Sequence, residues 1–307
     1  MTTNSPRQTV SYLMRRFGEV GIQPQTRYGQ NFLIDINLID LLVQSADLQP
    51  TDIVLEVGTG TGSLTANLAA RVAAILTVEI DPHLYALASE TLIDLPNVTM
   101  LQVDALKNKN RLHPVLLAML DEIRACYAPG ALKLVANLPY NIATPLISNL
   151  LDLSDPPESM TVTIQKELAE RITARPRTKD YSALSLWIQS QCDVEIKRIM
   201  APTVFWPRPK VESAIIQITY NRELRSRIGD LDYWHAFLRA MFFHRRKFLR
   251  SELLSAFKGR LGKPELDAIL AEMSFAPETR AEELDVAAML RLCDRMRSQF
   301  PDWKLPG

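Results

Sequence analysis

The sequence predicts an α/β fold: a largely parallel sheet covered by helices, followed by a small all-helical domain. From residue 51 onward, short apolar runs alternate with helical patterns, which is typical of parallel strands joined by crossover helices. After Asn221 the apolar residues recur only at helical spacing. The 307 residues are 47% hydrophobic and 23% charged, enough for one large or two ordinary domains with a buried core.

The expected elements follow in chain order. A strand at 53–57 (IVLEV) leads through a glycine turn into a helical pattern that ends near Ala70. Pro82 suits the first turn of the helix after the second strand. Strands are expected at 53–57, 74–79, 97–106, 132–137, 160–165, 192–200 and 213–220. Amphipathic helical patterns cover 233–257, 263–273 and 281–300, so we place a first domain with an N-terminal arm at 1–222 and a helical domain at 223–307.

The charge is unevenly distributed although the net charge is zero. Residues 165–260 carry 19 basic and 10 acidic side chains, whereas 1–164 carry 10 and 16. A local positive field can hold a phosphate backbone, and an ordinary solvated surface is the alternative.

The three cysteines, Cys126, Cys192 and Cys293, lie far apart without a CxxC pair. This argues against a disulfide framework or a metal site and favours a reducing, cytoplasmic compartment. The sequence contains neither an apolar run long enough for a membrane span nor a secretory signal at its N-terminus.

The first strand ends in LEVGTGTGSLT, which contains Gly58, Gly60 and Gly62. Glycines let a turn approach a ligand closely, and a helix N-terminus follows. The spacing departs from the dinucleotide pattern G-x-G-x-x-G because Ser63 stands at its third position. With Glu56 before it, the turn suits a nucleoside ligand without a pyrophosphate, as in S-adenosylmethionine-dependent methyltransferases; a merely tight turn is the alternative.

Acidic residues end the next two strands. Glu79 lies 21 residues after Gly58, where a carboxylate can accept hydrogen bonds from both ribose hydroxyls. Asp104, in VDAL, can accept a bond from an adenine amino group. Because the carboxyl ends of parallel strands share one edge, we predict S-adenosylmethionine binding there rather than two solvated strand ends.

The fourth strand leaves the sheet at the same edge through NLPY. Taken alone, these residues indicate only a turn. Beside a methyl donor they suit the exocyclic amine of adenine, whose lone pair is delocalised into the ring. The Asn137 amide oxygen and the Leu138 carbonyl, directed by Pro139, can accept its two N–H groups, and Tyr140 offers a flat face for the base. Such a site acts by positioning and electrostatics.

Taken together, the motifs resemble the small-subunit ribosomal RNA adenine N6,N6-dimethyltransferase family. They are RYGQNFLID, LEVGTGTGSLT, TVEIDPHL, VDAL, NLPY, QKELAERI, TKDYSALSLW, FWPRPKVESA and FFHRRKFLR, and they run in order from residue 27 to about 250. The resemblance implies a Rossmann-like class I S-adenosylmethionine-dependent methyltransferase domain with a small C-terminal all-helical domain.

The resemblance also implies roles for single residues. Asn31 and Leu33 would contact the methionine end of the cofactor, and Gly58 and Gly60 would lie against it. Asn137 would lie between the cofactor and the target amine.

Two further sets of roles follow. Tyr140 and Phe205 would stack the target adenine from opposite sides, with a plain core aromatic as the alternative for Phe205. A basic helix over FFHRRKFLR would bind the rRNA backbone, with a solvated helix face as the alternative. Its basic side chains are Arg245, Arg246, Lys247 and Arg250.

The implied enzyme dimethylates N6 of two adjacent adenosines in the 3′-terminal hairpin of small-subunit rRNA during ribosome biogenesis, after each base leaves its stack. Its partner would be that rRNA or the small-subunit precursor, and we expect a cytoplasmic monomer. One alternative is a large-subunit rRNA adenine N6-methyltransferase of the antibiotic-resistance type, which shares the fold; the C-terminal helical domain argues against it. Another is a non-catalytic ribosome-assembly factor; the intact glycine turn and Asn137 argue against it.

Overall fold

The computed structural model describes residues 10–19, 21, 24, 29–244 and 246–305. Its internal contacts group the chain into two compact units. One comprises Met1–Ala169 and Val194–Tyr220, the other Glu170–Asp193 and Asn221–Gly307. The helical unit thus includes residues 170–193, whereas the sequence suggested a single boundary after residue 222.

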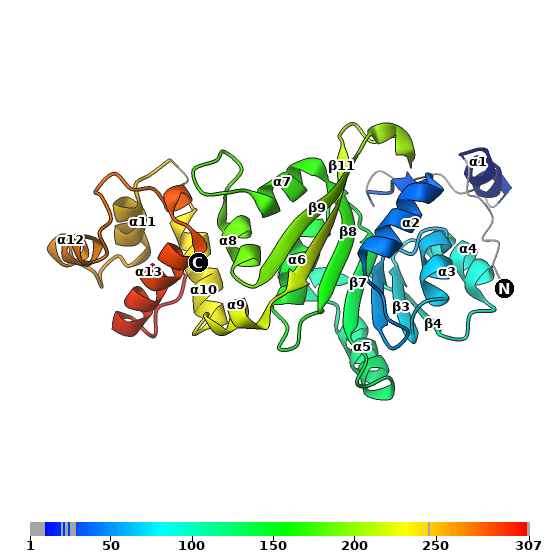
Figure 1. Cartoon of the computed structure of the whole chain (residues 1–307), viewed down its shortest axis with the longest axis horizontal. Coiled ribbons are helices and arrows are strands. Elements are labelled where there is room, and N and C mark those ends of the chain that lie inside the picture. Colours follow the sequence, from blue (N-terminus) through cyan, green and yellow to red (C-terminus); the bar gives the residue numbers. More distant parts are fainter. Residues whose placement is uncertain (1–9, 20, 22–23, 25–28, 245, 306–307) are drawn as a thin grey trace. The chain divides into compact units, whose positions relative to one another are not determined.

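The first unit is built on a seven-stranded sheet of order β4-β3-β2-β7-β8-β11-β9 (Figure 1). The five strands from β4 to β8 are parallel, and β11 runs antiparallel to β8. All residues of β2 and β3 are buried, as expected for parallel strands covered on both faces. The predicted α/β fold is confirmed. The strands are β2 (Ile53–Val57), β3 (Ala74–Glu79), β4 (Val98–Gln102), β7 (Leu132–Asn137), β8 (Ser159–Gln165), β9 (Cys192–Met200) and β11 (Ser213–Tyr220).

The third predicted strand is shorter than expected. It ends at Gln102, and the chain then forms a separate hairpin from β5 (Leu106–Asn108) and β6 (Arg111–Leu112). Asp104 therefore lies two residues beyond the end of β4, in the loop that follows it.

Helices connect the strands of the sheet. Asp81 caps α4 by accepting a hydrogen bond from the His83 backbone N–H at 2.9 Å, and Pro82 occupies the first turn, as predicted. Two short strands, β1 (Phe32–Leu33) and β10 (Phe205–Trp206), pair outside the main sheet. The helices are α1 (Val10–Glu19), α2 (Ile36–Ser45), α3 (Ser63–Ala69), α4 (Pro82–Leu92), α5 (Pro114–Cys126), α6 (Ala143–Leu151) and α7 (Lys166–Thr173).

The second unit is helical. Trp234, which is fully buried, donates its indole N–H to Ser190 Oγ at 3.0 Å, and Tyr181 donates its hydroxyl to the Leu284 carbonyl at 3.0 Å. These bonds connect residues 170–193 to the C-terminal helices. Within the described parts of the chain, none of the helices has the length and apolar character needed to cross a membrane. The helices are α8 (Ala183–Gln189), α9 (Arg222–Ser226), α10 (Leu231–Met241), α11 (Leu249–Ala256), α12 (Lys263–Glu272) and α13 (Val286–Gln299).

The prediction of a continuous basic helix over FFHRRKFLR is wrong. α10 ends at Met241 and α11 begins at Leu249, so Arg246 and Lys247 lie between the two helices. The extended conformation of Phe248 (φ −68°, ψ 147°) interrupts the helical hydrogen bonding. The His244 backbone N–H donates to the carboxylate of Glu252, which is 3% exposed. In a continuous helix the same N–H would donate to the backbone carbonyl four residues earlier.

Candidate active site

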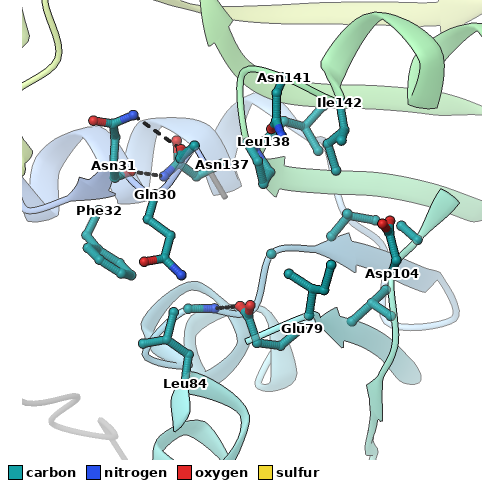
Figure 2. A pocket seen from close by; sticks show the side chains of 18 of the residues that line it. Gln30, Asn31, Phe32, Glu79, Leu84, Asp104, Asn137, Leu138, Asn141 and Ile142 are labelled. Carbon is teal, nitrogen blue, oxygen red and sulfur yellow. Dashed lines mark hydrogen bonds between the residues drawn. The ribbon is translucent and has the colours of Figure 1, made fainter. Parts of the chain in front are cut away.

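A pocket of about 290 Å³ lies at the carboxyl ends of β2, β3, β4 and β7 (Figure 2). This is the edge at which open α/β sheets bind ligands. Eight of the predicted site residues line it: Asn31, Gly58, Gly60, Glu79, Asp104, Asn137, Leu138 and Pro139. The other lining residues are Gly29, Gln30, Phe32, Val57, Val78, Ile80, Leu84, Val103, Ala105, Asn141 and Ile142.

The glycine turn after β2 is shaped for close approach. Gly58 and Gly60 have φ angles of +88° and +58°, which side chains other than hydrogen rarely allow. A Cβ atom on Gly58 would lie 3.3 Å from Pro139 Cδ, and one on Gly60 would lie 3.2 Å from Phe32 Cε1. Larger residues at either position would strain the turn and crowd the pocket walls.

Glu79 lies at the end of β3 and is 5% exposed. Its Oε2 accepts a bond from the Gly60 backbone N–H, and its Oε1 accepts one from the Asp81 N–H, both at 2.9 Å. Burial raises the pKa of this carboxyl, while the two backbone bonds favour its charged form. These bonds orient the carboxylate beside the glycine turn, and each oxygen keeps further capacity to accept.

Asp104 lies at the opposite side of the pocket from Gln30 (Figure 2). Its Oδ1 accepts a bond from the Leu106 backbone N–H at 2.9 Å, which fixes the loop after β4. The loop thus brings a second carboxylate to the pocket although the strand has already ended.

The Asn137 side chain is held by a segment far away in sequence. Its Nδ2 donates to the Asn31 backbone carbonyl at 2.8 Å, and Asn31 Nδ2 donates to the Gly29 carbonyl at 3.2 Å (Figure 2). Because the amide nitrogen makes this bond, its oxygen is the atom that remains to accept. The Leu138 backbone N–H donates to the Thr163 carbonyl at 3.1 Å, which anchors the chain as it leaves β7.

Three predicted residues lie outside the main pocket wall. Tyr140 is half-buried, and its hydroxyl shares a 2.6 Å hydrogen bond with Ser213 Oγ at the start of β11; burial raises its pKa. Leu33 is 8% exposed and lines a smaller cavity of about 50 Å³ beside the pocket. Phe205 is 2% exposed and packs in a core cluster with Leu33 and Ile39. It lies in β10, which pairs with β1, and its stacking on the target base stays a prediction.

Glu56 lies beneath the glycine turn and is 1% exposed. Its Oε2 accepts bonds from the hydroxyls of Thr65 at 2.5 Å and Thr77 at 2.7 Å, while Oε1 has no partner within the described chain. Burial raises the pKa of this carboxyl to about 8. Burial thus favours the protonated form, and the two threonine bonds connect this side chain to α3 and β3.

The sequence reasoning missed several lining residues. Gln30 donates to Asp81 Oδ2 at 3.1 Å, and the Phe32 ring covers Gly60. Both belong to the YGQNFL motif, in which only the flanking Asn31 and Leu33 were assigned.

The predicted basic residues differ in their surroundings. Arg246 and Lys247 are exposed in the turn before α11. Arg250 instead donates to both carboxylate oxygens of Asp267, at 2.5 and 2.9 Å. Arg245 lies outside the described residues.

The family model for ribosomal RNA adenine dimethylase matches residues 21–297. The chain belongs to this family. It is an enzyme that transfers methyl groups from S-adenosylmethionine to adenine in ribosomal RNA. The sequence-based prediction of the family and of the Rossmann-like class I fold is thereby confirmed.

Individual relatives agree with this assignment. The chain is 35% identical to "Ribosomal RNA small subunit methyltransferase A" of Lactococcus lactis over 271 residues, which cover 88% of this chain and 89% of the relative. A dimethyladenosine transferase from Plasmodium falciparum matches with a TM-score of 0.71 and 24% identity, over 86% of this dimethylase and 97% of that chain. The 23S rRNA methyltransferase ErmE matches with a TM-score of 0.59 and 24% identity, over 86% and 98%. At these identities the two structures support the fold alone.

Proposed function

We propose that this dimethylase acts on N6 of two adjacent adenosines in the 3′-terminal hairpin of small-subunit rRNA, during assembly of the small ribosomal subunit. The name of the Lactococcus lactis relative supports the choice of subunit. The observation that carries the proposed chemistry is the hydrogen bond from Asn137 Nδ2 to the Asn31 carbonyl, since it leaves the amide oxygen as an oriented acceptor at the pocket.

The residues of the pocket fit the cofactor. Glu79 is oriented by two backbone N–H groups and can accept from the ribose hydroxyls, while Asp104 can accept from the adenine amine. Gly58 and Gly60 leave room where a Cβ would crowd the walls, and Asn31 lies beside Asn137 at the proposed methionine end. When bound, S-adenosylmethionine supplies an electrophilic methyl group on a sulfonium.

The proposed target site lies at the NLPY segment. The Asn137 oxygen and the Leu138 carbonyl would hold the two N–H groups of the adenine amine, with Pro139 limiting the direction of the carbonyl. Tyr140 would stack on the base, and the bond from its hydroxyl to Ser213 would keep the ring in one orientation. Phe205, whose ring is 2% exposed, remains the predicted partner of Tyr140 on the other face of the base.

We propose that the rRNA backbone contacts the turn that follows α10. Arg246 and Lys247 are exposed there and can reach phosphates. Arg250 contributes less to this surface because its charge is already paired with Asp267.

The test is methyl transfer from labelled S-adenosylmethionine to purified small and large ribosomal subunits that lack the modification, followed by mapping of the labelled adenosines. Asn137→Ala serves as the catalytic control. We expect label on two adjacent adenosines of the small-subunit 3′ hairpin. Label confined to large-subunit rRNA would favour the antibiotic-resistance type of enzyme, whose fold ErmE shares. No label from a folded protein that binds the cofactor would favour a non-catalytic assembly factor.

We also propose that the protein acts as a monomer in the cytoplasm. Sedimentation of the purified chain at several concentrations tests the first point, and fractionation of cells that express it tests the second.

A further inference from the structure

The N-terminal helix α1 has one buried face. Leu13 and Phe17, four residues apart, are 1% and 2% exposed, whereas Met14 is 58% exposed. Side chains four apart share one face of a helix, so Leu13 and Phe17 dock α1 along an apolar stripe. Its buried partners are Leu84 and Leu87 of α4, and Phe32, Ile34 and Trp206 pack against the same cluster.

The centre of this cluster is an aromatic group of three rings. The Phe17 ring lies 5.3 Å from the Phe32 ring in an edge-to-face arrangement and 5.4 Å from the Trp206 ring. The Phe32 and Trp206 rings, which face each other across the β1–β10 pair, lie 6.3 Å apart and are stacked. Phe17 therefore contacts both strands of this pair.

Two members of the cluster are also walls of the cofactor pocket. Phe32 and Leu84 line it, and Figure 2 shows both side chains on the side opposite Asp104. The Phe32 ring covers Gly60, whose backbone N–H in turn orients Glu79. The contact that Phe17 makes with the Phe32 ring can thus affect the pocket through a single ring.

An ion pair adds to the docking of α1. Arg16 lies 3.2 Å from Glu90 of α4, but the Glu90 side chain is 69% exposed. Exposed pairs contribute little, so the buried Leu13 and Phe17 stabilise the docking of α1 more than this pair does.

We propose that Phe17 is a positioning residue for the cofactor pocket. It holds the Phe32 ring in the orientation that forms the pocket wall, so that cofactor binding does not have to order this wall. Fixing a mobile side chain on binding reduces affinity, and removing the Phe17 ring should weaken cofactor binding roughly three- to tenfold. This inference rests on the proposed placement of the cofactor.

The experiment measures the dissociation constant of S-adenosylhomocysteine by calorimetry on the full chain, together with thermal unfolding. We expect Phe17→Ala to raise the dissociation constant about three- to tenfold, Phe17→Leu to give a smaller rise, and the exposed Met14→Ala to leave it unchanged. In turnover assays the KM for the cofactor should rise while kcat at saturation is kept.

A double-mutant cycle tests whether Phe17 acts through Phe32. In a Phe32→Ala background, Phe17→Ala should no longer change the affinity. If Phe17→Ala does not fold, Phe17→Leu, which preserves most of the apolar volume, carries the same comparison. A folded Phe17 variant that binds with wild-type affinity, even with a lower melting temperature, would show that α1 has only a structural role.

Glu79→Ala separates this inference from the proposed site. If Glu79→Ala binds the ligand as tightly as the wild type, the cofactor does not occupy this pocket and both proposals fail. If Glu79→Ala weakens binding and the Phe17 variants do not, only the positioning role of Phe17 is lost.

Discussion

Replacing Asn137 by Ala should separate catalysis from stability. The variant loses the half-buried bond from Nδ2 to the Asn31 carbonyl and the amide oxygen that would align the target amine. One such hydrogen bond contributes about 1 kcal/mol to the free energy of unfolding. Losing one preorganised polar contact to a reacting centre costs ~10²–10³ in turnover, or about 3–4 kcal/mol. We therefore expect a large loss of rate in a protein that is only slightly destabilised.

The assay is single-turnover methylation of unmethylated small subunits at saturating cofactor, paired with thermal unfolding and cofactor calorimetry. Rate should fall by about two orders of magnitude or more, while substrate binding stays nearly unchanged and cofactor binding weakens modestly at most. An Asn137→Ala enzyme within about threefold of wild-type turnover would refute an aligning role for this amide.

Tyr140 provides the comparison within the same segment. Tyr140→Ala should slow methylation through poorer capture of the flipped base, since the stacking ring is lost. Tyr140→Phe removes only the bond to Ser213 and should be mild, as should Ser213→Ala. A Phe variant as inactive as the Ala variant would mean that the hydroxyl itself acts, and the stacking role would have to be abandoned.

Three further predictions concern the cofactor, the rRNA and pH. Glu79→Ala should weaken cofactor binding in calorimetry without unfolding the chain, because the carboxylate is held at the pocket by two backbone bonds; unchanged affinity would mean that the cofactor does not occupy this pocket. Replacing Arg246 and Lys247 by Ala should weaken rRNA binding and lower the slope of log affinity against log salt by about one unit per lost phosphate contact. Arg250→Ala should change this slope less, because the Arg250 charge is paired with Asp267. Equal slopes for all variants would mean that the turn is only a solvated surface. Burial raises the pKa of Glu56 to about 8 in the folded state, from 4.5 when unfolded, so the folded state holds this proton more tightly. The free energy of unfolding should therefore fall as pH rises from 5 to 8, by up to about 2–3 kcal/mol between pH 5 and 7. In Glu56→Gln the free energy of unfolding, measured by thermal unfolding, should fall less over this pH range than in the wild type. Equal pH dependence of the two proteins would show that Glu56 does not have a raised pKa.

Local periodicity in the sequence was enough to predict the sheet and one edge of the site. The apolar runs at 53–57, 74–79 and 132–137 correspond to β2, β3 and β7. Because parallel strands end at a common edge, the sequence alone placed Glu79 and Asn137 at the same edge. The sequence also predicted the turn after β2, because the positive φ angles found there favour glycine and the chain has glycine at those positions.

Contacts between distant segments could be decided only by the tertiary structure. The partner of Asn137 is a carbonyl 106 residues away, and the ring of Phe205, whose motif resembles that of a stacking residue, is buried in a core cluster with Leu33. The predicted basic helix is interrupted because Phe248 is extended and the His244 backbone donates to the buried Glu252 side chain. Strand and helix periods arise from neighbouring residues and can be read from the chain, whereas burial and hydrogen-bond partners depend on which surfaces meet once the elements have packed.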